Sequence, residues 1–190
     1  VAMIAPVGFA LLLWFDWMKQ PEINQGFFGA VVADRFSLFF QLLIIGVSSS
    51  LLLASTRFLE RKMVFRGEFI TLILLAASGM MLLTSARELI TIFVALELAS
   101  LPMVALVAMQ SDKPSAEAGL KMFVIGAVSS AVLVYGMVFV YGYTGTTYLE
   151  GIVDRIGELG VVSDQPFGSY AILFGIVMIT AGFGFKIAVV

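Results

Sequence analysis

The fold is decided by the apolar stretch LITIFVALELASLPMVALVAM, residues Leu89–Met109. As a helix it is long enough to cross the hydrocarbon core of a bilayer, which takes about 20 apolar residues. Glu97 is a single carboxylate in its middle, and Pro102 follows in the same run. A charge at membrane depth costs about 2.5–3.5 kcal/mol on insertion scales, so an ionisable residue placed there indicates a functional site.

The composition of the rest of the chain agrees with a membrane protein. Of 190 residues, 61% are hydrophobic and 13% are charged, and the mean hydropathy is +1.05. Soluble domains carry about 25% charged residues and could not hide this much apolar surface. The net charge of −2 offers no basic face for nucleic acid. We therefore predict an all-α protein that crosses the membrane several times.

Two residue types are missing from the sequence, and each excludes a class of chemistry. The chain has no cysteine, which excludes disulfides, thiolate metal sites and cysteine-ligated iron–sulfur clusters. It has no histidine either, which removes the side chain that most often carries protons at neutral pH. Proton chemistry in this chain therefore depends on carboxylates, lysines and water.

Six apolar runs are predicted to be transmembrane helices, the first of which is short and looks truncated. None of them shows the alternation of apolar and polar residues that is typical of membrane strands. They cover residues 1–15, 36–56, 69–86, 89–109, 116–143 and 170–190. A seventh segment, 147–160, has apolar residues at helical spacing and predicts a short amphipathic helix outside the membrane, with a hairpin over part of it as the alternative. Apolar sequence at both ends predicts that the chain is a piece of a longer protein.

Basic residues predict the orientation of these spans. Arg57, Arg61, Lys62 and Arg66 cluster between the second and third runs. The excess of positive charge in cytoplasmic loops places the loop 57–66 in the cytoplasm. Alternation then places the loop 110–115 there as well, and the connections 16–35 and 143–168 outside.

Charges within the predicted spans occur only in the last three, which carry Glu97, then Lys121 with Glu117 close to the start of its span, and Lys186. Lys121 has Glu117 four residues before it, so a surface pair that reaches the membrane interface explains it as well as a functional role does. Its depth differs from that of Glu97, so only water could connect the two.

Lys186 follows two glycines, Gly182 and Gly184, which each weaken a helix by roughly 1 kcal/mol relative to alanine. A weakened helix beside a buried charge predicts a discontinuous span that lines a wet cavity, as in ion-moving proteins. The alternative is that Lys186 ends the last span at the cytoplasmic face.

Glu97 also has a structural interpretation, in which a protonated carboxyl donates one hydrogen bond between helices. Pro102 favours the functional one, because proline has no N–H to donate to the carbonyl of Leu98. That carbonyl can hold water one residue from Glu97. We therefore predict irregular helix geometry at Pro102, Gly182 and Gly184.

Three stretches carry a resemblance to a known family. They are LELASLPMVALVAM (Leu96–Met109), SAEAGLKMFVIGAVSSAVLVYGMVFVYGYTGT (Ser115–Thr146) and GFGFKIAVV (Gly182–Val190). In this order and spacing they resemble the N subunit of bacterial NADH–quinone oxidoreductase, or respiratory complex I, an antiporter-like membrane subunit. The resemblance covers nearly the whole chain from Asp34, which would be the first half of such a subunit.

The resemblance implies a proton-pumping module without a redox centre, built from inverted repeats that each contain a broken helix. Glu97 would be the family's mid-span glutamate, Lys121 the lysine of the next span, and Lys186 the broken-helix lysine whose proton affinity the glutamate switches. NADH, FMN, iron–sulfur clusters and quinone would be bound by other subunits. Its partners would be the other membrane subunits, the lipid bilayer, protons and internal water, in the inner (plasma) membrane.

Two other functions remain open at this point. The first is a subunit of an Mrp-type cation/proton antiporter, which is related to this family. The second is a structural membrane subunit in which the buried charges only specify how the helices pack.

Overall fold

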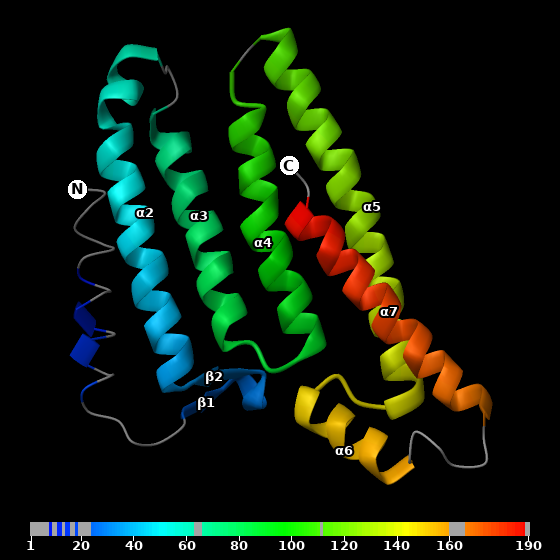
Figure 1. Cartoon of the computed structure of the whole chain (residues 1–190). Helices are drawn as coiled ribbons and strands as arrows, with labels where there is room; N and C mark the ends of the chain where they lie inside the picture. Colours follow the sequence, from blue (N-terminus) through cyan, green and yellow to red (C-terminus); the bar gives the residue numbers. More distant parts are fainter. Residues whose placement is uncertain are drawn as a thin grey trace. The chain divides into compact units, whose positions relative to one another are not determined.

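The computed structural model describes residues 24–62, 66–110, 112–159 and 166–188, together with positions 8, 11, 12, 14, 15 and 18. Five helices among these residues are long and apolar enough to cross a membrane (Figure 1). They are α2 (Arg35–Lys62), α3 (Arg66–Ser85), α4 (Leu89–Val107), α5 (Lys113–Thr144) and α7 (Pro166–Ala188). The predicted all-α membrane fold is confirmed, while the first predicted span, 1–15, lies mostly outside the described residues.

Two compact units divide the chain. The first comprises Val1–Ala86 with Val94–Leu106, and the second comprises Arg87–Phe93 with Val107–Val190. Helix α4 contributes residues to both, because its first turn belongs to the second unit and its middle to the first. Glu97 therefore belongs to the first unit, and Lys121 and Lys186 belong to the second.

A small hairpin precedes α2 in the first unit, where we had expected only a connection. Strand β1 (Asn24–Gly26) pairs antiparallel with β2 (Val31–Ala33), with Asn24 opposite Ala33. A short 3₁₀ turn, η1 (Phe27–Gly29), joins them, and Gly29 has a φ of 89°. Only glycine adopts that conformation without strain, which is why the chain can reverse there.

Helix α2 begins with a reciprocal cap. The carboxylate of Asp34 accepts from the backbone N–H of Ser37 at 2.7 Å, and the hydroxyl of Ser37 accepts from the N–H of Asp34 at 3.0 Å. Such a pair satisfies donors that a helix start leaves unbonded. The helix continues to Lys62, so residues 57–62 are helical and not part of the loop that we had expected over 57–66. Arginine, leucine, glutamate and lysine are strong helix formers, and helical hydrogen bonding does not stop where the apolar run ends.

Helices α2 and α3 pack side by side in the first unit (Figure 1). Leu38 and Ile45 are buried there, with Leu42 and Met81 packed against them. Further along α3, a Cβ atom at Gly79 would collide with the backbone of Leu98 and Ala99 in α4. A glycine there lets the two helix backbones touch, which is how membrane helices gain packing energy.

In the second unit, α5 has a defined start and stop. The carboxylate of Asp112 accepts from the N–H of Ser115 at 2.8 Å, and Pro114 lies in the first turn, where its missing N–H costs nothing. At the other end Gly145 has a φ of 72°, and its N–H donates to the carbonyl of Tyr141 at 2.7 Å. The helix thus begins at Lys113, inside the region that we had assigned to the loop 110–115.

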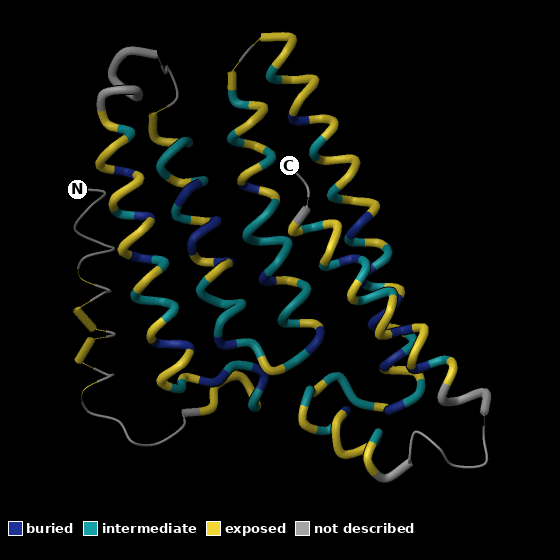
Figure 2. The backbone as a smooth tube through the Cα atoms, viewed as in Figure 1, coloured by how far each residue is buried: buried dark blue, intermediate teal, exposed yellow. Residues whose placement is uncertain are grey.

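Helix α7 packs antiparallel along α5 through glycines. A Cβ at Gly136 would meet the carbonyl of Gly175 at 2.7 Å, and one at Gly182 would meet the backbone of Leu133 at 2.9 Å. The rings of Phe139 and Phe174 meet edge to face with centroids 5.1 Å apart. Most buried positions of α5 therefore lie from residue 129 onward (Figure 2).

This packing also explains an expectation that was wrong. Helix α7 is continuous from Pro166 to Ala188, so the break that we had expected at Gly182 and Gly184 is not found there. Gly182 is buried against Leu133, so the absence of its side chain serves helix contact. Lost helix propensity of roughly 1 kcal/mol is overridden when tertiary packing supports the helix.

The segment after α5 forms a short helix, α6 (Leu149–Leu159), as the spacing of its apolar residues predicts. Ile152 is buried, whereas Val153, Asp154 and Arg155 are exposed. A helix of this length rises about 16 Å, which is too short to cross a bilayer core of about 30 Å. The amphipathic segment is confirmed as a helix, and its position outside the membrane stays a prediction.

Candidate functional site

Glu97 lies half-buried in the middle of α4. The residues that follow it, Leu98 and Ala99, are the ones whose backbone meets Gly79 of α3, so Glu97 directly precedes a close contact between two helices of the first unit. The hydroxyl of Ser100 lies 3.5 Å from the carbonyl of Glu97, at the limit of a hydrogen bond. Close helix packing thus fixes the backbone that presents the carboxylate.

Pro102 is buried, and α4 continues through it from Leu89 to Val107. The ring removes the N–H that would bond to the carbonyl of Leu98. Leu98 is the residue directly after Glu97. Whether water occupies that carbonyl stays a prediction.

Lys121 is paired with Glu117 on α5. Its Nζ lies 2.5 Å from Glu117 Oε1, and the two side chains are 69% and 66% exposed in this chain. The sequence left two interpretations of Lys121 open, a surface pair with Glu117 and a functional role, and the structure contains the pair. Exposed pairs of this kind contribute about 0.3–0.5 kcal/mol, so Glu117 orients Lys121 more than it stabilises the helix.

Lys186 lies half-buried in the last turn of α7. The antiparallel register sets Gly182 against Leu133, so one further turn brings Lys186 level with about Ser129 of α5. Lys121 is eight residues from that level, or about 12 Å along the helix axis. The second unit thus holds both lysines on packed helices but at different depths.

Glu88, a carboxylate that we did not single out from the sequence, accepts a hydrogen bond on each of its two oxygens. Its Oε1 accepts from the hydroxyl of Thr147 at 2.7 Å, and its Oε2 accepts from the hydroxyl of Thr91 at 2.9 Å. Thr147 is 59 residues away in the sequence. The Thr91 contact is local and could have been guessed from spacing, whereas no sequence signal points to Thr147.

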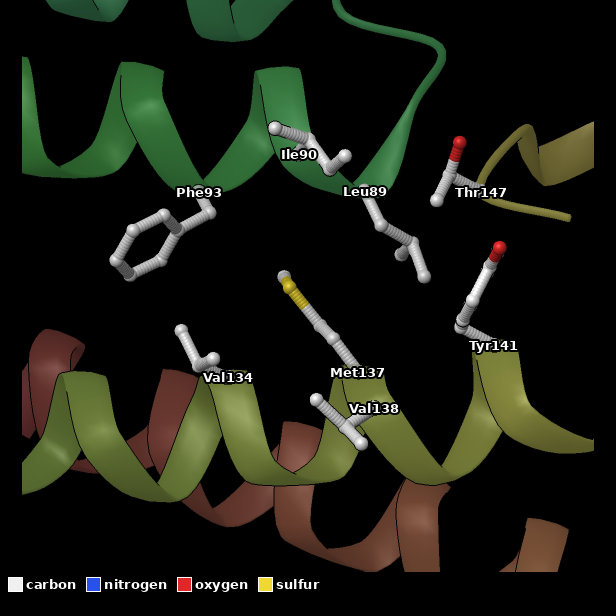
Figure 3. Close-up of a pocket in the computed structure, with 8 residues that line it drawn as sticks. All are labelled: Leu89, Ile90, Phe93, Val134, Met137, Val138, Tyr141 and Thr147. Carbon is white, nitrogen blue, oxygen red and sulfur yellow. The ribbon is translucent and has the colours of Figure 1, made fainter.

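An apolar cavity of about 500 Å³ lies beside Glu88 in the second unit. Figure 3 shows Leu89 and Phe93 of α4 facing Val134 and Met137 of α5 across this space, with Thr147 and Tyr141 at one end. Ile90 and Val138 complete the lining. Apart from Tyr141 and Thr147 the lining is apolar, so the cavity suits apolar groups.

Asp112, in the loop before α5, is a carboxylate whose pKa the structure shifts. Hydrogen bonds from Ser115 hold the pKa of Asp112 below its ordinary value, because they favour the charged carboxylate. Among the residues that the structure describes, no three acidic side chains cluster in a way that could hold a metal ion.

Comparison with known proteins places this arrangement in a family. Residues 86–190 match the family model described as NADH:quinone oxidoreductase/Mrp antiporter, TM. NADH-quinone oxidoreductase subunit N of Jannaschia sp. is 41% identical over 181 residues, which are 95% of this chain and 36% of that protein. Subunit N of Myxococcus xanthus is 39% identical over 192 residues and covers 100% of this chain and 35% of that protein. The chain thus spans about a third of the length of these relatives.

Two solved structures share the arrangement of helices. Respiratory complex I from Thermus thermophilus with bound aureothin aligns over 100% of this chain and 46% of that chain, with a TM-score of 0.63 and 26% identity. An archaeal membrane-bound sulfane sulfur reductase aligns over 96% of this chain and 38% of that chain, with a TM-score of 0.79. Its 20% identity supports the fold alone. The chain belongs to the NADH:quinone oxidoreductase/Mrp antiporter membrane family, and within it is similar to subunit N of NADH-quinone oxidoreductases.

Proposed function

We propose that this chain is part of a proton-translocating membrane subunit of an NADH–quinone oxidoreductase. The observation that carries the proposal is that Glu97, half-buried near the middle of α4, is the one charged residue in the sequence of this membrane-spanning helix. Keeping an ionisable group there has a cost that a purely structural helix avoids. The relatives named above are subunits of an enzyme complex of this kind, and energy from electron transfer elsewhere in it would drive the protons.

The proposed mechanism uses Glu97 as a counter-charge and Lys186 as the proton carrier. A nearby carboxylate favours a charged ammonium, whereas a lysine left alone in a low-dielectric environment favours its neutral form. When the Glu97 charge is near, Lys186 takes a proton. When that charge moves away, Lys186 gives the proton up.

Lys121 is the proposed relay between the cytoplasmic side and the interior. Its pair with Glu117 keeps the ammonium near the start of α5, which lies in the cytoplasm if the positive-inside assignment holds. Water has to carry the proton between Lys121 and Lys186, because their levels along α5 differ by about 12 Å. The protein's own part is to hold the two lysines on the same pair of packed helices.

The experiment uses the full complex reconstituted into liposomes. Glu97→Gln removes the charge and keeps the shape, and it should lower the number of protons translocated per NADH as well as coupled quinone reduction. Glu97→Ala should do the same. Glu68→Gln, an exposed carboxylate in the first turn of α3, is the matched control and should behave as wild type. A wild-type number of protons per NADH and a wild-type rate of quinone reduction in both Glu97 variants would contradict the proposal.

An Mrp-type cation/proton antiporter is the second candidate, because the description of the matching family model names both kinds of protein. Dependence of transport on sodium instead of NADH would favour it. The structural alternative makes a different prediction, since Glu97→Gln would then lower the amount of assembled complex without changing the activity per complex.

A further inference from the structure

Two helix beginnings meet at Glu88. The N–H of Leu89, the first residue of α4, donates to the carbonyl of Thr147 at 2.9 Å. The N–H of Leu149, the first residue of α6, donates to the carbonyl of Arg87 at 3.0 Å. The first four N–H groups of a helix have no partner within it. The first N–H of each helix is therefore bonded to a carbonyl just before the start of the other helix.

The side chain of Glu88 adds two more bonds at the same place, from Thr91 and Thr147. We call this arrangement, formed by Arg87–Thr91 and Thr147–Leu149, the clasp. Helix N-termini carry partial positive charge, and a carboxylate there is favourable. A glutamate suits the clasp because it faces two helix starts and two hydroxyl donors at once.

The clasp joins the start of α4 to the connection between α5 and α6, with Glu88 and Thr147 59 residues apart in the sequence. Glu97 lies nine residues further along α4, or about 13 Å by helical rise. A helix transmits a shift at its first turn to its middle because its backbone is hydrogen-bonded throughout. Pro102 removes one of those bonds on the other side of Glu97. Along α4, Glu97 thus lies between the clasp and the position of the missing hydrogen bond.

We propose that Glu88 is a positioning residue, which acts through the clasp to fix the axial position of α4 and so the depth of Glu97. This inference rests on the proposed function, because the depth of Glu97 matters only if its charge takes part in translocation. This positioning role of Glu88 and Thr147 follows neither from the family match nor from the charges within the spans. Glu88 itself takes no proton in this scheme.

The test is made in the full complex with Thr147→Val, which keeps the shape of the side chain and removes the hydroxyl. Loss of one charge-assisted hydrogen bond should speed amide exchange at Leu89 and Leu149 by roughly tenfold. The number of protons translocated per NADH should fall, because Glu97 is no longer held at its depth. Thr147→Ser restores the hydroxyl and should restore both measurements. Thr71→Val, an exposed threonine on α3 that bonds only to its own helix, is the matched control.

The outcomes separate this inference from the proposed function. Faster exchange with an unchanged proton yield would overturn the positioning role and leave the clasp as a purely structural contact. Unchanged exchange would overturn the clasp itself. If Thr147→Val does not assemble, Glu88→Gln gives the same comparison, because it keeps the length and one acceptor oxygen. A wild-type proton yield in Glu97→Gln would instead refute the proposed function, whatever the clasp variants show.

Discussion

At the scale of single residues, the glycines of α7 show how position decides what a residue does. Gly182 and Gly184 look equivalent in the sequence, where both weaken the helix beside Lys186. In the structure a Cβ at Gly182 would meet the backbone of Leu133, whereas nothing lies within 4 Å of Gly184. The first glycine is needed for contact between α5 and α7, and the second is not.

This difference predicts opposite effects of two alanine substitutions. Gly182→Ala should destabilise the packing of α5 and α7 by about 1–3 kcal/mol, the usual cost of overpacking against backbone that cannot move aside. Gly184→Ala should leave stability unchanged or raise it by up to about 1 kcal/mol, because alanine favours a helix. Thermal unfolding of the detergent-solubilised complex compares the two. Equal midpoints for both variants would contradict the packing role of Gly182.

At the scale of elements, boundaries depended on capping more than on hydropathy. Apolar runs located α2, α3, α4, α5 and α7, but α2 runs past its apolar run to Lys62, and α5 begins early, at Lys113. Asp112 and Pro114 carry the signal for that early start, since both suit the beginning of a helix. Such local signals can be read from sequence, whereas the hairpin of β1 and β2 was missed because its strands are only three residues each.

The cap of α5 predicts a pH dependence. Hydrogen bonds lower the pKa of Asp112 in the folded state below its ordinary value of 3.8, so its contribution to stability is fully present above that value. The contribution is lost as the pH falls through the lowered pKa. Asp112→Ala should fray the first turn at neutral pH and speed amide exchange at Ser115. Asp112→Asn keeps a cap and removes its titration, so equal exchange in all three proteins would contradict the cap.

At the scale of the whole molecule, the alternation of spans gives a prediction about sides of the membrane. Lys113 and Asp154 are both exposed, and α5 lies between them in the sequence. The positive-inside rule places Lys113 in the cytoplasm, so Asp154 on α6 should lie outside. Because the chain has no cysteine, Lys113→Cys and Asp154→Cys each introduce its only thiol. A membrane-impermeant maleimide should label the first only in inverted vesicles and the second only in right-side-out membranes.

Labelling of both thiols from one side would show that α5 does not cross the membrane. Labelling of each from the opposite side to the one predicted would leave the spans intact and reverse the orientation. The labelled subunit is identified by its mass after separation from the other subunits, and the complex without either substitution shows the labelling of all other thiols.

The sequence by itself determined the membrane class and five of the spans, because hydrophobic length is a local property of the chain. It also singled out Glu97, Lys121 and Lys186 from the cost of buried charge, and their roles stay predictions. Only the tertiary structure decided that Gly182 serves packing and that Glu88 bonds to Thr147. It also set Lys186 level with about Ser129. These facts depend on contacts between residues about 45 to 60 positions apart. Side-chain spacing within one helix carries no information about which distant helix will lie against it.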